Sequence, residues 1–360
     1  MEKKKDRKSY RHMNGIEIIG LGKAVPETRL TNEDLRQYMD TSDEWIRSRT
    51  GIVSRHLCTG EESLTDLATE ASRKAMEDAG IAPEEVGLVI CATCTTDYMV
   101  PSVACAVQEN IGIPGGVPAF DINAACSGFV YGLQLIYSLM NAEAACRSER
   151  KYALMIGGEQ LSKMLDFSER SVSVLFGDGA AAAIVRGSSQ KRFFCHTAAE
   201  GDRSALYAHT VGRNQIPAME YKGKRIVSEN PLQITEAYAA GIMKDGYLRM
   251  DGRKVFRFAV RVLAAEIDQM AEQSKVPAEE IDYIVCHQAN SRIIDYVRKQ
   301  KNLPEEKFFM NLQEYGNTSG ASIPLALADM KDRGMLKPGT RIFCIGFGAG
   351  LTWGGCYLEF

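Results

Sequence analysis

The chain contains two copies of one sequence pattern, and this internal repeat limits the folds that are open to it. Residues 81–91 (IAPEEVGLVIC) resemble residues 276–286 (VPAEEIDYIVC), where a proline and two acidic residues precede a short apolar run that ends at a cysteine. Apolar residues at helical spacing precede each copy, over about 64–79 and 255–273. The repeat predicts two similar halves that are related by a pseudo-twofold axis.

The repeat continues to the end of each half. In both copies an apolar strand leads through small residues into a helix, a second strand follows, and a glycine-rich turn leads to a closing strand. The paired segments are 120–128 with 309–320, 153–158 with 342–348, and 180–185 with 354–360. Alternating strands and helices predict an α/β fold with largely buried sheets. Side chains at equivalent strand ends should therefore meet across the axis.

A segment with a different pattern separates the two halves. Residues 187–250 contain many turn signals and few features of a compact α/β unit, which predicts an inserted cap. We therefore expect a polar N-terminal tail over 1–14, a first half over 15–186, the cap over 187–250, and a second half over 251–360.

Charge and hydropathy argue against several kinds of partner. The formal net charge of -3 argues against nucleic-acid binding, and no apolar run approaches the ~20 residues of a membrane-spanning helix. The first residues lack the apolar stretch of a signal peptide, so the ten cysteines predict a reducing cytoplasm and no disulfide framework. Cys91 and Cys94 form a CxxC pair without a second pair of metal ligands, and we interpret them as structural.

One cysteine has the surroundings of a nucleophile. Cys126 lies in DINAACSGF (121–129), between a predicted strand and a predicted helix. Unpaired backbone N–H groups and the positive end of the helix dipole favour a thiolate there. Most cysteines are nevertheless inert core residues, so this interpretation depends on what the second half places beside Cys126.

The second half supplies a histidine and an asparagine at equivalent positions. His287 follows the predicted strand that ends at Cys286, and Asn317 lies in GNTSG (316–320), the segment equivalent to the Cys126 turn. Alone, the histidine would be interpreted as a structural hydrogen-bonded residue and the asparagine as a turn or cap residue. The duplication predicts instead that Cys126, His287 and Asn317 converge.

Together these motifs resemble the β-ketoacyl-(acyl-carrier-protein) synthase III family, which belongs to the thiolase-fold condensing enzymes. The resemblance covers about residues 16–360 and implies a thiolase-like fold, with two pseudo-symmetric α/β halves in αβαβα layers. The motifs that carry it are DTSDEWI (40–46), RTGI (49–52), AACSGF (124–129), FGDGA (176–180), HQAN (287–290), GNTSG (316–320) and GFGAGLTWG (346–354). Each motif is weak alone, but their order and spacing are highly specific.

The resemblance implies a decarboxylative condensation of acyl-coenzyme A with malonyl-acyl-carrier protein, without a metal or redox cofactor, which initiates fatty-acid synthesis. Cys126 would attack the acyl-coenzyme A thioester, and the backbone N–H groups of Cys126 and Ala349 would bind the oxyanion. His287 and Asn317 would donate hydrogen bonds to the malonyl thioester oxygen as carbon dioxide leaves. The family also implies a homodimer.

The resemblance further implies a coenzyme A site. A tryptophan in the family stacks on the coenzyme A adenine opposite an arginine, and these match Trp45 and Arg170. The matching coenzyme A residues are Trp45, Arg49, Arg170 and Asn290. Thr41 and Glu44 predict a capping box at the start of the helix that carries Trp45.

A basic surface and an acyl pocket are also implied. Arg257 lies in a stripe of arginines spaced four residues apart, and Arg292 and Lys299 share one face of the next predicted helix. We expect this surface to steer an acidic carrier protein. Phe256 and Val100 match acyl-pocket positions, Val100 from the partner subunit, where a small valine predicts a primer larger than acetyl.

Two other functions stay open. A specialised homologue could condense or transfer an unusual acyl group in secondary metabolism, and a scaffold could bind carrier protein without catalysis. Intact Cys126, His287 and Asn317 argue against the scaffold. Asn317 distinguishes the chain from elongating synthases, which have a second histidine, and from thiolases, which have a second cysteine. Plant-type polyketide synthases share Cys-His-Asn, but the segment over 40–45 favours the synthase III branch.

Overall fold

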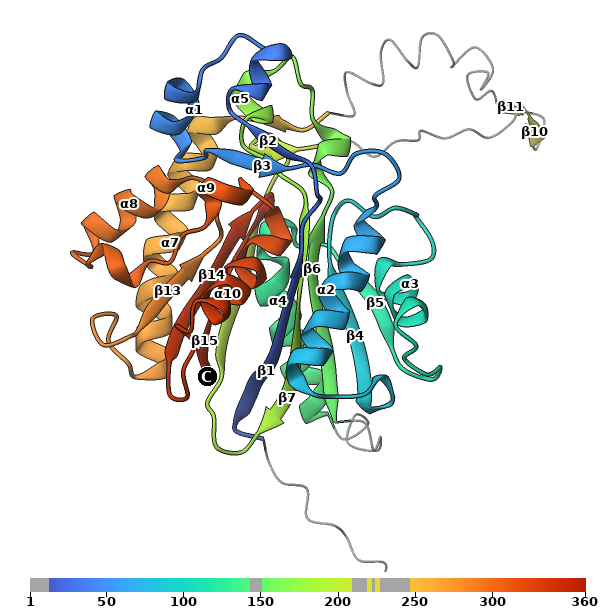
Figure 1. Cartoon of the computed structure of the whole chain (residues 1–360), viewed down its shortest axis with the longest axis vertical. Coiled ribbons are helices and arrows are strands. Elements are labelled where there is room, and N and C mark those ends of the chain that lie inside the picture. The colour runs from blue at the N-terminus through green and yellow to red at the C-terminus, as the bar shows by residue number, and fades with distance from the viewer. Residues whose placement is uncertain (1–12, 143–150, 209–218, 222–223, 227–246) are drawn as a thin grey trace, which may run out of the picture.

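Two β-sheets, one for each copy of the repeat, lie with helices between them and on both outer sides (Figure 1). The computed structural model describes residues 13–142, 151–208, 219–221, 224–226 and 247–360. The expected αβαβα layering and the thiolase-like fold are confirmed.

The two sheets share one strand pattern. The first sheet has the order β1 (Gly15–Ala24), β7 (Gly179–Ser188), β6 (Tyr152–Glu159), β4 (Val86–Ala92) and β5 (Ala119–Ile122). The second has the order β8 (Phe194–Asp202), β15 (Gly350–Glu359), β14 (Arg341–Gly348) and β13 (Tyr283–Cys286). In each sheet the strands at one end pair in parallel and the others pair antiparallel. The parallel pairs are β6 with β4 and β4 with β5 in the first sheet, and β14 with β13 in the second. The pairing of Cys91 with Ile156 matches that of Cys286 with Ile345, as the repeat predicts.

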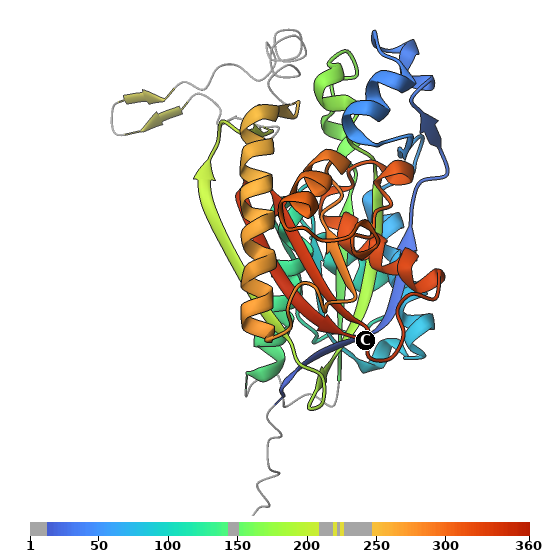
Figure 2. The same ribbon diagram turned by 90° about the vertical axis from the view of Figure 1, so that its left-hand side faces the viewer.

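The helices follow the same division. Helices α2 (Leu64–Ala79) and α3 (Val103–Asn110) cover the outer face of the first sheet (Figure 1). Helices α7 (Gly252–Ser274) and α8 (Ser291–Gln300) cover that of the second (Figure 2). Helices α4 (Gly128–Asn141) and α10 (Ser322–Asp332) lie between the sheets. Because α4 meets both sheets, its sequence is apolar on most sides. Among the described helices, none has the length and apolar character that crossing a lipid bilayer requires.

The expected cap requires a correction at its N-terminal end. Residues 194–202 form β8, the edge strand of the second sheet, so the second copy starts before residue 251. β8 is the counterpart of β1. It lies so close to β15 that a Cβ atom at Gly354 would be only 2.6 Å from the His196 carbonyl oxygen. The shorter strands of this segment are β9 (Leu206–Tyr207), β10 (Met219–Tyr221), β11 (Lys224–Ile226) and β12 (Arg249–Met250). Residues 209–218, 222–223 and 227–246 of the expected cap, and residues 1–12 of the expected tail, lie outside the described residues.

Short N-terminal elements lie at one end of the molecule (Figure 1). They are β2 (Arg29–Thr31), α1 (Asp43–Thr50) and β3 (Ser54–His56), beside α5 (Arg170–Ser173) and α9 (Leu312–Tyr315). The buried Arg55 guanidinium joins these elements, because it donates to Asn32 Oδ1 (2.9 Å) and to the Val174 carbonyl (2.7 Å). The expected capping box was wrong: Ser42 caps α1, and its Oγ accepts a hydrogen bond from the Trp45 N–H.

Candidate active site

The two halves contribute matching turns to the centre of the molecule. A 3₁₀ turn, Ala125–Ser127, precedes α4, and its counterpart, Ser319–Ala321, precedes α10. Ala125 has φ of 46° and Ser319 has φ of 47°, a conformation that is uncommon for residues other than glycine. Ala125 and Ser319 are different residue types that adopt the same uncommon backbone angle. The two halves therefore share the conformation of this turn as well as the strands of the sheet.

Each turn packs against a glycine of the opposite half. A Cβ atom at Gly157 on β6 would lie 2.3 Å from the Gly320 carbonyl oxygen, and one at Gly346 on β14 would lie 2.8 Å from Ser127 Cα. Any side chain at either glycine would therefore push one turn away from the axis. The close contact brings Cys126 next to residues of the second half.

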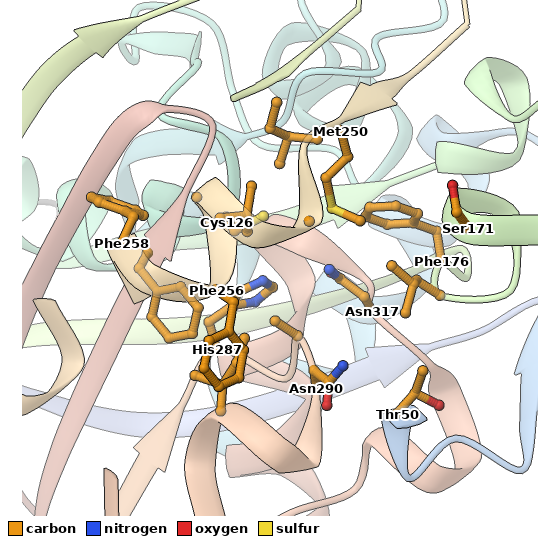
Figure 3. Close-up of a pocket in the computed structure, with 18 of the residues that line it drawn as sticks. Thr50, Cys126, Ser171, Phe176, Met250, Phe256, Phe258, His287, Asn290 and Asn317 are labelled. Atoms are coloured by element: carbon orange, nitrogen blue, oxygen red, sulfur yellow. The ribbon is translucent and has the colours of Figure 1, made fainter. Parts of the chain in front are cut away.

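Cys126, His287 and Asn317 line one cavity of about 240 Å³, as the repeat predicts. Cys126 comes from the turn before α4, His287 follows β13, and Asn317 precedes the turn before α10. Figure 3 shows the three side chains around a common space, with Phe256 lining the same cavity. Three side chains from three separate segments of the chain therefore face one cavity, although Asn317 follows helix α9 and not the strand that the repeat predicts.

Burial dominates the electrostatics of Cys126. The residue is only 5% exposed, and burial raises the pKa of its thiol to about 12. A hydrogen bond with Ser319 lowers this pKa and the nearby Glu159 raises it, but neither outweighs the loss of water. Burial therefore opposes the thiolate that the helix terminus favours, and at this pKa Cys126 rests as a thiol near neutral pH.

His287 is buried and neutral. Burial lowers the pKa of its imidazole to about 3. Its Nδ1 lies 2.7 Å from Ser322 Oγ, and its ring meets Phe347 edge-on with centroids 5.2 Å apart. A neutral imidazole beside a neutral thiol means that the resting site contains no preformed ion pair between them.

The backbone orients the Asn317 side chain. Its Oδ1 accepts a hydrogen bond of 2.8 Å from the Ser319 N–H. Its own N–H donates to the Leu175 carbonyl, which fixes the main chain. Because the side-chain oxygen is engaged in this way, the amide nitrogen is the group that faces the cavity, and it points toward the His287 imidazole in Figure 3.

The expected coenzyme A residues gather at the outer end of the cavity, which is lined by Trp45, Arg49 and Asn290. The Trp45 ring contacts two guanidinium groups, with Arg49 Cζ at 4.6 Å and Arg170 Cζ at 4.7 Å from its centroid. Arg170 also donates to the Asp40 carbonyl at 2.7 Å. The Asn290 side chain caps α8 and donates to the Arg49 carbonyl at 3.0 Å, so it also joins α8 to α1.

The expected acyl-pocket and oxyanion residues occupy different places. Phe256 lines the cavity with Cys126, whereas Val100 is 82% exposed and is absent from that lining. Ala349 lines a neighbouring cavity of about 870 Å³. It directly follows Gly348, where a Cβ atom would lie 2.8 Å from Cys126 Cβ. The Ala349 backbone is thus close to the nucleophile, and its part in an oxyanion hole stays a prediction.

The three expected basic residues are exposed, and two of them adjoin residues that line the cavity. Arg257 adjoins Phe256 on α7, and Arg292 lies between the lining residues Asn290 and Ile293 on α8. Lys299 is exposed near the far end of α8. Arg261, in the same arginine stripe as Arg257, pairs with Glu200 at 3.0 Å.

Sequence reasoning missed three polar residues behind the cavity. Ser322 contacts His287, Ser319 contacts both Cys126 and Asn317, and the fully buried Glu159 contacts Ser319. The sequence contained one indication that Glu159 lies near the site. The repeat aligns Glu159 with Gly348, whose backbone packs against Cys126.

The chain also matches known proteins along most of its length. It matches the model of 3-oxoacyl-[acyl-carrier-protein] synthase III over residues 120–202, and the model of the C-terminal part of these enzymes over residues 271–360. It is 43% identical over 347 residues to a beta-ketoacyl-[acyl-carrier-protein] synthase III of Clostridium acetobutylicum, covering 96% of this chain and 99% of the relative. A Clostridium botulinum enzyme with the same name is 41% identical, with 95% of this chain and 98% of the relative covered.

Solved structures give the same result. The 3-oxoacyl-[acyl-carrier-protein] synthase III of Aquifex aeolicus has a TM-score of 0.81 and 39% identity, with 96% of this chain and 100% of that chain covered. The enzyme of Thermus thermophilus has a TM-score of 0.81 and 37% identity, covering 96% and 99%. The priming β-ketosynthase of the R1128 polyketide biosynthetic pathway has a TM-score of 0.82 and 29% identity, covering 97% of both chains.

Proposed function

Because the chain belongs to the 3-oxoacyl-[acyl-carrier-protein] synthase III family, we propose that Cys126, His287 and Asn317 are the residues that carry out its reaction. The protein is a condensing acyltransferase: it joins the acyl group of acyl-coenzyme A to malonyl-acyl-carrier protein, releases carbon dioxide, and so initiates fatty-acid synthesis. The observation that carries the residue assignment is their convergence on one cavity. The reaction requires no cofactor.

In the first half-reaction the Cys126 sulfur attacks the thioester carbonyl of acyl-coenzyme A. The carbonyl oxygen becomes negative as the carbon becomes tetrahedral, and the N–H groups of Cys126 and Ala349 stabilise it. Collapse of this adduct releases coenzyme A and leaves an acyl thioester on Cys126.

In the second half-reaction malonyl-carrier protein loses carbon dioxide. The electron pair left behind moves onto the malonyl thioester oxygen, where His287 and Asn317 donate hydrogen bonds. His287 can donate from Nε2 when its Nδ1 accepts a hydrogen bond, so the Ser322 hydroxyl is then the donor in that contact. The low pKa of His287 keeps the imidazole neutral, so this donor carries no net charge. The carbanion attacks the acyl group and releases the β-ketoacyl product.

The direct test is intact-protein mass spectrometry. The enzyme is incubated with a panel of acyl-coenzyme A primers and then with malonyl-carrier protein. An adduct that malonyl-carrier protein discharges as a β-ketoacyl product supports the condensation and identifies the primer. An adduct that malonyl-carrier protein does not discharge would move the assignment to a specialised acyltransferase.

Trp45→Ala should raise the KM for acyl-coenzyme A roughly tenfold, because aromatic stacking on a base contributes about 1–3 kcal/mol. Arg170 Cζ lies 4.7 Å from the centroid of the Trp45 ring, and we propose that the adenine binds between these two side chains. The measurement is the KM of Cys126 acylation. The matched substrate is acyl-pantetheine, which lacks adenine, and its KM should not change. Equal losses with both substrates would mean that Trp45 only supports the fold.

Arg292→Glu should raise the KM for malonyl-carrier protein about tenfold and weaken its dependence on salt, because the exposed cation then no longer attracts an acidic partner. Acylation by acyl-coenzyme A should be unchanged. Arg261→Ala is the control, because the Arg261 guanidinium already pairs with Glu200. Equal effects of the two substitutions would contradict a carrier surface at Arg257, Arg292 and Lys299.

We also propose a homodimer through the open edge of the first sheet. β5 is the last strand of that sheet, and the nearby Tyr98, Met99 and Val100 are 62%, 89% and 82% exposed. A partner chain on this edge would cover this apolar segment and place Val100 near the partner's acyl pocket, where a small valine favours a primer larger than acetyl. Sedimentation equilibrium at the mass of one chain would contradict the dimer.

A further inference from the structure

Glu159 is a buried carboxyl group to which the reaction described above gives no role. It is the last residue of β6, and it is 0% exposed. Its oxygens accept hydrogen bonds from Thr95 Oγ1 (2.6 Å), Thr93 Oγ1 (3.2 Å), the Cys94 N–H (3.1 Å) and Ser319 Oγ (3.2 Å). The first three donors follow β4 in the first half, whereas Ser319 belongs to the second half. The carboxyl group therefore joins the two halves at the turn that precedes α10.

Ser319 connects this carboxyl group to Asn317. Its hydroxyl donates to Glu159 Oε1 at 3.2 Å, and its backbone N–H donates to Asn317 Oδ1 at 2.8 Å. Ser319 has a φ of 47°, and such a conformation persists only where the surrounding structure holds it. The side chain of Ser319 is thus held by Glu159, while its main chain orients the Asn317 amide.

The equivalent turn of the first half lacks this connection. The repeat aligns Asn317 with Asn123, whose Oδ1 accepts a longer hydrogen bond of 3.2 Å from the Ala125 N–H. Ala125 occupies the position of Ser319 and has no hydroxyl group. Asn123 is exposed, whereas Asn317 is 6% exposed and lines the active-site cavity. The two turns therefore share a backbone conformation, and the turn that carries Asn317 differs by its bond to Glu159.

The spacing of the two turns shows why a carboxyl group fits on one side only. The equivalent of Glu159 at the end of β14 is Gly348, where a Cβ atom would lie 2.8 Å from Cys126 Cβ. The equivalent of Cys126 in the second turn is Gly320, where a Cβ atom would lie 3.5 Å from Glu159 Oε1. In one half the nucleophile faces a glycine, and in the other half the carboxyl group faces a glycine.

We propose that Glu159 is a positioning residue, which holds the Ser319 hydroxyl and thereby fixes the Asn317 amide for decarboxylation. The amide nitrogen must meet the malonyl thioester oxygen as negative charge develops there. A displacement of about 1 Å in such a group can slow a reaction by about 10²-fold. The proposal rests on the role of Asn317 in the proposed function, and it requires no proton transfer by Glu159.

The experiment measures carbon dioxide release from malonyl-carrier protein by acyl-enzyme that has been formed in advance and freed of acyl-coenzyme A. Cys126 is acylated from the start, so effects on its thiol do not enter this rate. Ser319→Ala should lower the maximal rate about tenfold, because the Asn317 amide loses its support. The concentration of malonyl-carrier protein that gives half the maximal rate should not change. Alanine suits position 319, because Ala125 has a φ of 46° in the equivalent turn.

Substitutions of Glu159 test the same hydrogen bond from its other side. Glu159→Ala should slow the discharge by the same factor as Ser319→Ala, and the double variant should be no slower than either single variant. Glu159→Gln is the matched variant, because its amide keeps the shape of the carboxyl group and can still bond to the Ser319 hydroxyl. It should discharge the acyl-enzyme within about threefold of the native rate. Additive losses in the double variant would contradict a shared bond.

Asn317→Ala distinguishes positioning from general support of the fold. Without the Asn317 amide, Ser319→Ala should cause no further loss of rate. Thr95→Val removes a donor on the side of Glu159 away from Ser319, so it should lower Tm but not the discharge rate. A native rate in Ser319→Ala, or an undiminished further loss in the Asn317→Ala background, would overturn the positioning role of Glu159. A native rate in Asn317→Ala would instead overturn the role of Asn317 in the proposed function.

Discussion

Cys126→Ala should form no acyl-enzyme with any acyl-coenzyme A primer, and turnover should fall by at least roughly 10³-fold, because the covalent intermediate cannot form. The measurement is the intact mass after incubation with the primer that gives the native adduct. The substitution removes a small buried side chain, so the protein should fold and still bind acyl-coenzyme A at Trp45.

Cys105→Ala is the matched control for this result. Cys105 is the exposed cysteine among those that the structure describes, so its thiol is the one most open to adventitious acylation. The native adduct should persist when Cys105 is replaced. An adduct that survives Cys126→Ala and disappears with Cys105→Ala would refute the assignment of the nucleophile.

His287→Ala should separate the two half-reactions. Acylation of Cys126 should continue, whereas discharge by malonyl-carrier protein should slow by about 10²–10³-fold, the usual cost of removing one donor to a developing oxyanion. The physical reason is that neutral His287 serves the malonyl thioester oxygen and not the Cys126 proton. The measurement is carbon dioxide release and loss of the acyl adduct, followed after excess acyl-coenzyme A has been removed.

Ser322→Ala is the matched variant for His287. It keeps the imidazole but removes the hydroxyl 2.7 Å from Nδ1, so it should slow the discharge less than His287→Ala does. If His287→Ala prevents the first acylation as well, His287 would be the base for Cys126. The two half-reaction rates therefore distinguish a role of His287 in decarboxylation from a role in acylation.

The sequence predicted the duplication and the convergence of the three site residues because both follow from local sequence patterns. Equivalent strands end in equivalent motifs, so the approach of Cys126, His287 and Asn317 followed from the repeat. The first strand of the second copy was missed. β8 is an edge strand whose neighbour carries Gly354 and Gly355, and its place depends on that partner more than on its own pattern.

Electrostatic properties were the least predictable part of the site. The local position of Cys126 favours a thiolate, but the observed burial reverses that preference, and burial depends on segments from the whole chain. The contact between Glu159 and Ser319 joins residues that are 160 positions apart. A local sequence pattern cannot predict a contact over that separation. The alignment of Glu159 with Gly348 indicated only that Glu159 lies near the centre of the molecule.

Because of the glycines at the axis, the proposed active site depends on the contact between the two halves. Neither half contains both the thiol and its hydrogen-bonding partners, and Gly157 and Gly346 set how closely the two sets approach. A larger residue at Gly157 or Gly346 would therefore move Cys126 away from His287 and Asn317 without changing any of the three.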